Sequence, residues 1–409
     1  MSYFYLILAV VSISVARFLN MRDSPPILGI YTRPGKWYFL KFLLFFGLLH
    51  FRKLMNKLRG EKVAANQSGY GVKSRSSPEL MDCSQPLSSD PKAIDAVYFN
   101  SASKDGQYLV GATARRPNGV INGFLYLKVP QIGLLLSPKI PDTTLQQTKE
   151  EEEAGVFGAE GIKFEPIEPM KRWKLTYQGK MKLFENPEKE VTVDLRAEWK
   201  SNLPVFDFDT DMDPAPVARA FAKETWSREY FELLKQAHQT HYEQHGDIDG
   251  TVTIDGVEFP LHLNSMRDHS YGHKREWKNF HRYGLHMVTL EDGTRFGLGV
   301  VSCPINFAQM ELGYVYKPNG EVVPLQRCDL KLYEHGEDGT PPLDYAFNFW
   351  AGNKKYCCQV KVLHSPEFYI GDEWEARVVE RMATFKVNGV PGWGIAEWEY
   401  RNTLGKVAI

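Results

Sequence analysis

The stretch GTVTIDGVEFPLHLNSMRDHSYG, residues 250–272, carries the clearest structural signal in this sequence. Residues rich in Val, Ile, Leu and Thr flank Asp255-Gly256, a dipeptide that favours the tight turn of a β-hairpin. The stretch ends in the polar and aromatic run Arg267 to Gly272, which directly follows an apolar strand. We therefore predict a β-hairpin with a dense polar cluster at its end.

Short apolar or alternating runs of the same kind recur from about residue 96 to residue 401. In residues 191–199 polar and apolar residues alternate, which is typical of a half-exposed antiparallel strand. One helical pattern interrupts these runs, because apolar residues follow Pro216 mostly at intervals of three to five as far as Gln244. We predict a mainly β fold in which two antiparallel β domains are joined by a helical segment.

Changes in composition divide the chain into five parts. About ninety atypical N-terminal residues precede a body that is long enough for two domains of roughly 150 residues each. We predict a membrane anchor and interfacial helix over 1–60, a linker over 61–92, a first β domain over 93–213, a helical connector over 214–246 and a second β domain over 247–409.

Two apolar segments near the N-terminus predict contact with a membrane through residues 2–20 and 37–53. The first segment is a marginal span at about 1.5 Å per residue, and basic residues after the second favour the cytoplasmic leaflet. We expect a protein of the endoplasmic reticulum or another endomembrane, with its body in the cytoplasm. Two alternatives stay open: residues 1–16 are a cleaved signal of a lumenal or secreted protein, or the second segment packs on the soluble body.

The charge balance and the motifs that are missing exclude several classes of partner. The 49 Lys and Arg residues against 50 Asp and Glu residues give a net charge of -1, so the chain offers no broad attraction for nucleic acid. The sequence lacks Walker, Rossmann and GxSxG signatures, and its five cysteines have no CxxC spacing. His238, His241 and His245 have helical spacing but no HExxH motif. We expect neither a cofactor nor a metal site.

The polar cluster at 267–272 has a functional and a structural interpretation. The 24 Phe, 20 Tyr and 9 Trp residues suit β-structure and apolar cavities, where burial of Arg267, Asp268 and His269 is costly unless they satisfy each other or a ligand. If Asp268 faces such a cavity, burial raises its pKa and lets it act as the acid that hydration or cyclisation of an isoprenoid requires. The alternative is a hydrogen-bonded knot that joins the strand end to the next hairpin.

Three motifs resemble the signature of the two-domain lipocalin-like proteins related to carotenoid 1,2-hydratase, AttH and the fungal survival-factor proteins. They are residues 250–256 with Arg267-Asp268-His269-Ser270-Tyr271-Gly272 and Trp277, residues 172–179 (RWKLTYQG), and residues 392–397 (GWGIAE). The chain most resembles an uncharacterised branch found N-terminal to phosphoenolpyruvate-synthase-like enzymes. Tyr271 stands where a Trp is common in the signature.

The resemblance implies two lipocalin-like barrels that hold a hydrophobic ligand in or between them. Three functions are then open: membrane-tethered binding of a lipid or isoprenoid, a hydratase (lyase), isomerase or cyclase of a polyene, or a non-catalytic β module that recruits protein partners. In the enzyme, Asp268 is the expected proton donor, with His269 or Tyr271 as its partner. The expected ligand-binding residues are an orienting pair, Arg267 and Glu276, and the pocket residues Trp277, Phe280, Tyr283 and Glu397.

Overall fold

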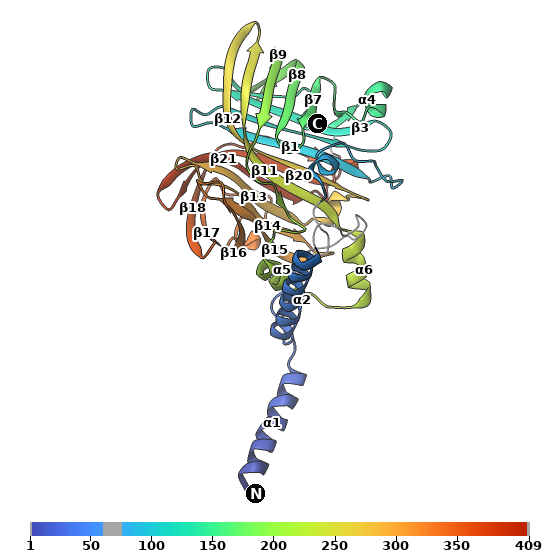
Figure 1. Ribbon diagram of the computed structural model, residues 1–409, viewed down its shortest axis with the longest axis vertical. Coiled ribbons are helices and arrows are strands. Elements are labelled where there is room, and N and C mark those ends of the chain that lie inside the picture. The colour runs from blue at the N-terminus through green and yellow to red at the C-terminus, as the bar shows by residue number, and fades with distance from the viewer. Residues whose placement is uncertain (1, 60–75, 407–409) are drawn as a thin grey trace.

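The computed structural model describes residues 2–59 and 76–406 (Figure 1). The first part of the predicted linker, residues 61–75, lies outside the described residues. The fold is mainly β, as the sequence predicted, and consists of two β units that lie against each other. Two N-terminal helices, α1 (Ser2–Asn20) and α2 (Tyr38–Arg59), extend from the second unit at the end of the molecule that holds the N-terminus.

The first β unit is a twelve-stranded sheet in the described part of the chain. Its strands are β1 (Ile94–Ala102), β2 (Tyr108–Arg115), β3 (Val120–Val129), β4 (Gly133–Leu136), β5 (Thr144–Gln146), β6 (Phe157–Ala159), β7 (Ile162–Glu168), β8 (Arg172–Leu183), β9 (Asn186–Lys200), β10 (Phe206–Asp207), β11 (Gln239–Ile254) and β12 (Val257–Gly272). Eight of them pair in a ring that runs β11–β12–β1–β2–β3–β4–β8–β9 and returns to β11.

Apolar side chains at alternate positions of these strands fill the ring. The ring centroid of Phe99 lies 5.7 Å from that of Trp173 and 6.4 Å from that of Trp199, and all three side chains are buried. The intervening positions are apolar too: Leu109 of β2 packs inside the ring, whereas Tyr108 packs in the cluster between the two units. Strands that are buried on both faces show such near-continuous apolar runs.

The second β unit is a closed antiparallel barrel of eight strands with one further strand, β19, at its side. The barrel closes because β18 pairs with β20 as well as with β17. The strands of this unit are β13 (Arg282–Leu290), β14 (Arg295–Cys303), β15 (Phe307–Tyr316), β16 (Val322–Cys328), β17 (Asp344–Ala351), β18 (Lys354–His364), β19 (Glu367–Ile370), β20 (Ala376–Val387) and β21 (Val390–Arg401).

The β11–β12 hairpin pairs with the first unit, although we expected residues 247–409 to form the second domain. β12 pairs with β1 along residues 264–272, and β11 pairs with β9 along residues 247–254. The expected boundary at residue 247 therefore falls inside β11. The sequence pattern predicted the turn of this hairpin but contained no signal for the strands at its outer edges, which are far away in the chain.

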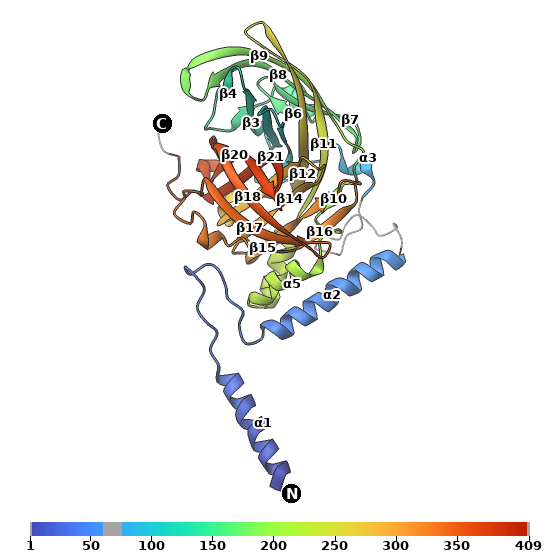
Figure 2. The same ribbon diagram turned by 90° about the vertical axis from the view of Figure 1, so that its left-hand side faces the viewer.

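The predicted helical connector is shorter than expected. It contains α5 (Pro214–Lys223) and α6 (Arg228–Gln236), and β11 begins at Gln239, before the expected end at residue 246. Asp213 caps α5, because its Oδ1 accepts a hydrogen bond from the backbone N–H of Ala215 at 2.8 Å. α5 lies between α2 and the second barrel, where it contacts β15 (Figure 2).

Helix α1 is apolar and none of its window Tyr3–Asn20 is buried, with a mean hydropathy of 1.7. Its length and composition fit a membrane anchor or a signal sequence. Helix α2 has two apolar faces: Phe45 packs on Phe221 of α5, with ring centroids 5.1 Å apart, whereas Phe39 and Phe51 are 69% and 60% exposed. α2 therefore packs on the β body, as one of our alternatives proposed, and still offers an apolar surface.

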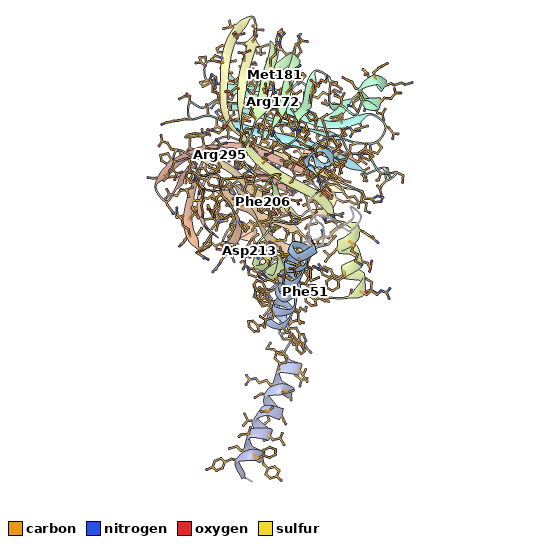
Figure 3. All side chains as sticks on the ribbon, viewed as in Figure 1. Phe51, Arg172, Met181, Phe206, Asp213 and Arg295 are labelled. Atoms are coloured by element: carbon orange, nitrogen blue, oxygen red, sulfur yellow. The ribbon has the colours of Figure 1, made fainter. Side chains whose placement is uncertain are left out.

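Polar contacts join the two β units at their boundary. Arg295 of β14, labelled in Figure 3, donates from Nη1 to the carbonyl oxygen of Gly246 at 2.8 Å and from Nη2 to Asp247 Oδ1 at 2.9 Å. Trp393 of β21 donates from Nε1 to Asn264 Oδ1 at 3.0 Å. The two units are thus held together by specific bonds in addition to the apolar cluster between them.

Candidate active site

A cavity of about 300 Å³ lies between the two β units rather than inside either ring. Outward-facing residues of β1, β2, β3, β11 and β12 form one wall, and residues of β13, β14, β15, β19, β20 and β21 form the other. Phe208, Met212 and Leu234 of the connecting region close one part of it. Most of the lining is apolar or aromatic, so polar side chains that face it are few and conspicuous.

The predicted polar cluster is split by strand alternation. Met266, Asp268 and Ser270 of β12 line the cavity, whereas Arg267 and His269 point into the first ring. Successive side chains of a strand lie on opposite faces, so a contiguous motif in a strand supplies two different environments. Of the three residues expected to act in catalysis, only Asp268 reaches the cavity.

Arg267 belongs to a closed network inside the first ring. Its Nη1 and Nη2 atoms donate to the two carboxylate oxygens of Asp82 at 2.8 and 3.1 Å, and Nη2 also donates to Gln244 at 3.1 Å. The guanidinium carbon lies 5.3 and 4.8 Å from the ring centroids of Trp173 and Trp199. A ligand-binding role is therefore wrong for Arg267, because both of its Nη atoms are bound within this network and the side chain is fully buried on the other face of the strand.

His269 is held in the same way by two partners. Its Nε2 lies 2.6 Å from Asp95 Oδ1, and its Nδ1 lies 2.8 Å from the hydroxyl of Tyr242. Asp95 also accepts from Arg115 at 2.7 Å, which completes the network. The hydrogen-bonded knot that was our alternative for the cluster therefore describes Arg267 and His269, but not Asp268.

The remaining predicted residues divide between the cavity and other places. Trp277, Phe280, Tyr283 and Glu397 line the cavity as expected. Glu276 does not line the cavity, since it pairs with Lys278 at 3.1 Å, a contact that lowers its pKa. The half-buried Tyr271 follows Ser270 on the opposite face of β12 and does not line the cavity either, so the structure does not bring it together with Asp268.

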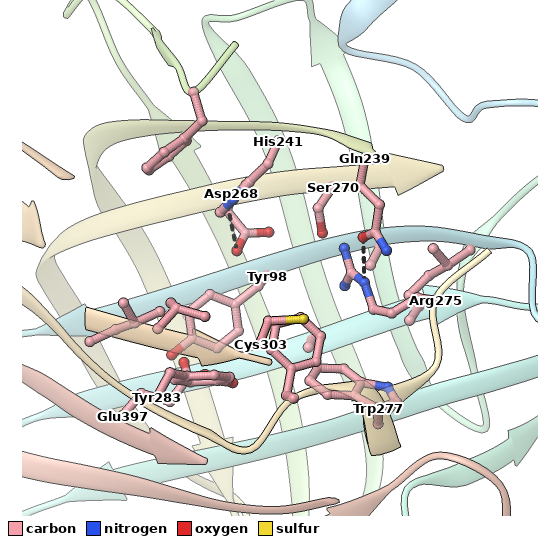
Figure 4. A pocket seen from close by; sticks show the side chains of 18 of the residues that line it. Tyr98, Gln239, His241, Asp268, Ser270, Arg275, Trp277, Tyr283, Cys303 and Glu397 are labelled. Atoms are coloured by element: carbon pink, nitrogen blue, oxygen red, sulfur yellow. Dashed lines mark hydrogen bonds and ion pairs between the residues drawn. The ribbon is translucent and has the colours of Figure 1, made fainter. Parts of the chain in front are cut away.

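Two carboxyl groups of the second barrel, Glu380 and Glu397, lie directly opposite each other on β20 and β21. Tyr98 donates a hydrogen bond to Glu380 at 3.0 Å, and Tyr283 donates one to Glu397. Tyr283 and Glu397 lie beside each other in Figure 4. Burial raises the pKa of Glu397 to about 7. Burial and the neighbouring Glu397 carboxyl raise the pKa of Glu380 well above its usual value. At neutral pH this pair therefore holds at least one proton.

A second carboxyl pair, Glu243 and Asp268, faces the cavity from β11 and β12. His241 Nε2 lies 3.5 Å from Asp268 Oδ2 and 3.5 Å from Glu243 Oε1. Burial raises the pKa of Glu243 to about 7, and its Oε2 accepts a hydrogen bond from Tyr314 at 2.7 Å. Burial lowers the pKa of His241, but the contact with Asp268 outweighs it, so the pKa is raised overall.

Sequence reasoning missed Glu243, His241 and Glu380, although a signal for the carboxyl pairs exists. Both hairpins have two-residue turns, Asp255-Gly256 and Asn388-Gly389, so their strands pair without offset. Glu243 and Asp268 each lie twelve residues from their turn, and Glu380 and Glu397 each lie eight residues from theirs. Counting outward from the turns therefore brings the acidic residues face to face.

Chemically, this arrangement places neutral carboxylic acids and an acid–imidazole pair on opposite walls of an apolar chamber. A neutral carboxyl group can donate a proton, and the ring faces of Trp277, Phe280 and Tyr98 can stabilise positive charge that develops on a substrate. Within residues 2–59 and 76–406, no group of three His, Cys, Asp or Glu side chains is arranged to hold a metal ion. His238, His241 and His245 do not share a helix, since α6 ends at Gln236.

The model of a family of unknown function (DUF8627) matches residues 6–400. The chain belongs to this family. The match covers both N-terminal helices, so they are part of the family's common architecture. None of the curated proteins matches the chain in sequence.

Among solved structures, the chain is similar to a protein described as an AttH from Nitrosomonas europaea, with a TM-score of 0.50 and 12% identity over 76% of this chain and 93% of that one. Kievitone hydratase from Nectria haematococca has a TM-score of 0.45 and 12% identity over 79% and 92% of the two chains. CghA has a TM-score of 0.45 and 10% identity over 83% and 99%. The likeness to AttH confirms the predicted resemblance for the fold; the branch near phosphoenolpyruvate-synthase-like enzymes stays a prediction.

Proposed function

We propose that the protein is an enzyme that binds a small apolar molecule in the cavity between its β units and transfers a proton to it. The observation that carries this proposal is the cross-strand pair Glu380–Glu397, because two buried carboxyl groups at directly opposite positions of neighbouring strands do not both ionise. The reaction class is hydration, isomerisation or cyclisation of a polyene or isoprenoid, since each can begin with protonation of a C=C bond.

Glu397 is the proton donor in this scheme, because burial and the nearby Asp268 carboxyl group raise its pKa, and Glu380 lies opposite it on the neighbouring strand. Trp277 and Phe280 present their rings to the same space and stabilise the cation that protonation creates. On the opposite wall Asp268, paired with His241, accepts a proton from water or from the substrate at the end of the reaction. Asp268 thus changes from the expected donor to an acceptor, because its Oδ2 lies 3.5 Å from the imidazole of His241.

The N-terminal helices support a location at a membrane. Residues 2–59 contain nine Lys and Arg residues against one acidic residue, Asp23, which favours an anionic cytoplasmic leaflet. In this location α1 would span the membrane or anchor the protein to it. The exposed apolar face of α2 would lie in the membrane–water interface beside the β body. A cleaved signal is the alternative for α1, and the compartment stays a prediction.

Carriage of an apolar ligand without chemistry is the second candidate, and the combination of an apolar chamber with a membrane-type helix favours it. A recruitment module without a ligand predicts no enclosed cavity, so the chamber argues against that third interpretation.

The test uses the full-length protein purified in detergent from a eukaryotic host, together with Glu397→Gln and Asp268→Asn. Mass spectrometry first identifies apolar compounds that co-purify with each protein. The recovered compounds are then incubated with parent protein in heavy water, and the gain of deuterium or of one water molecule is measured. The surface variant Glu190→Gln, which removes a carboxyl group from an exposed pair with Lys180, is the matched control.

We expect the parent and Glu190→Gln to exchange deuterium into the compound or hydrate it, and Glu397→Gln to retain the compound unchanged. The same unaltered compound in all four proteins, without exchange, would establish a carrier and contradict the enzyme. Full activity in Glu397→Gln would remove this residue from the role of donor.

A further inference from the structure

A second cavity, of about 250 Å³, lies beside the cavity between the β units. Asn122, Arg275 and Trp277 line both cavities, so these three side chains form the partition between them. Unlike the first cavity, the second is mostly polar: its walls include Lys92, Arg116 and the charged residues around the 3₁₀ helix Asp372–Trp374. An apolar chamber and a polar chamber thus share one wall.

Two arginines at this wall have no acidic partner. Arg116 donates from Nε to Asn122 Oδ1 at 3.0 Å and from Nη1 to the backbone carbonyl of Lys92 at 3.1 Å. Arg275 donates from Nε to Gln239 Oε1 at 2.6 Å. No carboxylate in the described part of the chain forms an ion pair with either guanidinium group. Asp372 and Glu375, the carboxylates that act on Arg116, are bound by Lys92, and Asp268 is the carboxylate that acts on Arg275.

Arg115 and the more deeply buried Arg267 and Arg282 each pair with a carboxylate, whereas the fully buried Arg381 has no carboxylate partner in the described part of the chain. Arg116 and Arg275 line the same cavity. A guanidinium that is removed from water without a counter-ion is costly, and the pKa of Arg116 is lowered to about 10 by burial and by the nearby charge of Arg275. The pair therefore gains free energy from any anion that enters between them.

Two further donors lie beside the same cavity. The indole Nε1 atoms of Trp277 and Trp374 are buried and have no hydrogen-bond partner within residues 2–59 and 76–406, and both residues line the second cavity. Buried donors in native proteins are nearly always paired. The wall of the second cavity combines three carboxylates, Asp372, Glu373 and Glu375, with four cations, Lys92, Arg116, Arg275 and Lys406, so positive charge is in excess, as a site for an anionic group requires.

We propose that the second cavity binds the acidic head, a carboxylate or a phosphate, of an amphiphile whose apolar chain enters the cavity between the β units. The inference rests on the proposed function and names the substrate class. In Figure 4, Arg275 and Trp277 lie at one end of the chamber, whereas Tyr283 and Glu397 lie at the other. A head held by Arg275 therefore directs the unsaturated chain toward the proton donor.

The experiment measures the affinity of the full-length protein for parinaric acid, a fluorescent polyene, and for its uncharged methyl ester. We expect the parent to prefer the acid, and both Arg116→Gln and Arg275→Gln to weaken binding of the acid by roughly tenfold to a hundredfold while binding of the ester changes by less than about twofold. Arg275→Lys should recover only part of the loss, since it keeps the charge but loses the planar fork. The exposed Arg196→Gln is the matched control.

Competition separates the possible sources of the anion. Displacement of parinaric acid by dodecyl phosphate but not by inorganic phosphate supports an amphiphile with a phosphate head, and displacement by neither shows that the site selects a carboxylate. Inorganic phosphate that binds as tightly as dodecyl phosphate would overturn the amphiphile. Equal affinity of the parent for acid and ester would overturn the head-group site, and this comparison does not depend on how any variant folds.

The result is separable from that of the proposed enzyme. Glu397→Gln removes the proton donor but leaves the two arginines, so it should keep the preference for the acid over the methyl ester, whatever its overall affinity for the chain. If Glu397→Gln stays fully active on a recovered compound while the arginine variants lose the acid, the enzyme scheme fails and the head-group site stands. If acid binding is unchanged in the arginine variants while Glu397→Gln is inactive, the head-group site fails and the enzyme scheme stands.

Discussion

On β12, Arg267 and His269 point into the first ring, whereas Asp268 and Ser270 point into the cavity between the β units. The first pair is fully enclosed by Asp82, Asp95 and their neighbours. Asp268, between them in sequence, lies 3.5 Å from His241 and directly opposite Glu243 on the neighbouring strand. The comparison teaches that the most conspicuous polar motif of the sequence combines two functions: one face of the strand holds the fold, and the other face equips the cavity.

The largest expected effect is on the ring face. Arg267→Leu leaves the buried carboxylate of Asp82 without its cation, so the free energy of unfolding should fall by about 3–5 kcal/mol. Chemical denaturation of the full-length protein in detergent, followed by tryptophan fluorescence, measures this loss. The double variant Asp82→Leu with Arg267→Leu should recover part of it. An unchanged free energy of unfolding in Arg267→Leu would contradict the structural role of this face.

Substitution of His269 should lower the free energy of unfolding by less than substitution of Arg267, because it removes the hydrogen bonds to Asp95 and Tyr242 but leaves the Arg267–Asp82 pair intact. His269→Phe keeps the ring volume but leaves Asp95 with Arg115 as its remaining charged partner and leaves Tyr242 without the imidazole. The free energy of unfolding should fall by about 2–3 kcal/mol. The same denaturation experiment measures it, and a loss as large as that of Arg267→Leu would show that the two networks act as one.

On the cavity face, unlike the ring face, the expected effect of a substitution on the free energy of unfolding depends on pH. The pKa of Glu397 rises from 4.5 to about 7 in the folded protein, so between these values the unfolded chain releases a proton that the folded chain keeps. Stability should therefore fall as pH rises through this window, and Glu397→Gln should remove on the order of 2 kcal/mol of that fall. Denaturation midpoints of parent and variant from about pH 4.5 to 7 measure it. Parallel curves would mean that Glu397 ionises normally.

The smallest effect is expected on the same strand outside both environments. His262 of β12 pairs with Asp249 at 3.0 Å, and the two side chains are 77% and 56% exposed. His262→Ala should change the free energy of unfolding by less than about 0.5 kcal/mol and leave ligand binding unchanged. A larger change would show that position along β12, rather than the face of the strand, decides the effect.

Local signals in the sequence predicted the elements but not their partners. The turn at Asp255-Gly256, the helix after Asp213 and the apolar α1 depend on residues close together in the chain, and all three are present. The pairing of β12 with β1 depends on contacts across more than 160 residues, for which a single sequence has no local signal. The hairpin was therefore predicted correctly and assigned to the wrong domain.

The candidate site shows the same division. Trp277, Tyr283 and Glu397 were predicted to line a cavity, and they do. His269 was predicted beside Asp268 although alternation along a strand separates neighbouring side chains. Glu380 and Glu243 were missed because each lies alone within an otherwise apolar or mixed strand, and only the register counted from each two-residue turn places it opposite another acid.

The proposal that the cavity contains protonated carboxyl groups is tested most directly by infrared spectroscopy of the protonated carboxyl C=O stretch in the parent and in the double variant Glu380→Gln with Glu397→Gln. We predict a band in the parent at about pH 6 that weakens as the pH rises above about 7 and that is clearly reduced in the double variant, where Glu243, whose pKa is also about 7, keeps its own part of the signal. Absence of the band from the parent at about pH 6, or an equally strong band in the double variant, would contradict the assignment of this pair as the acid.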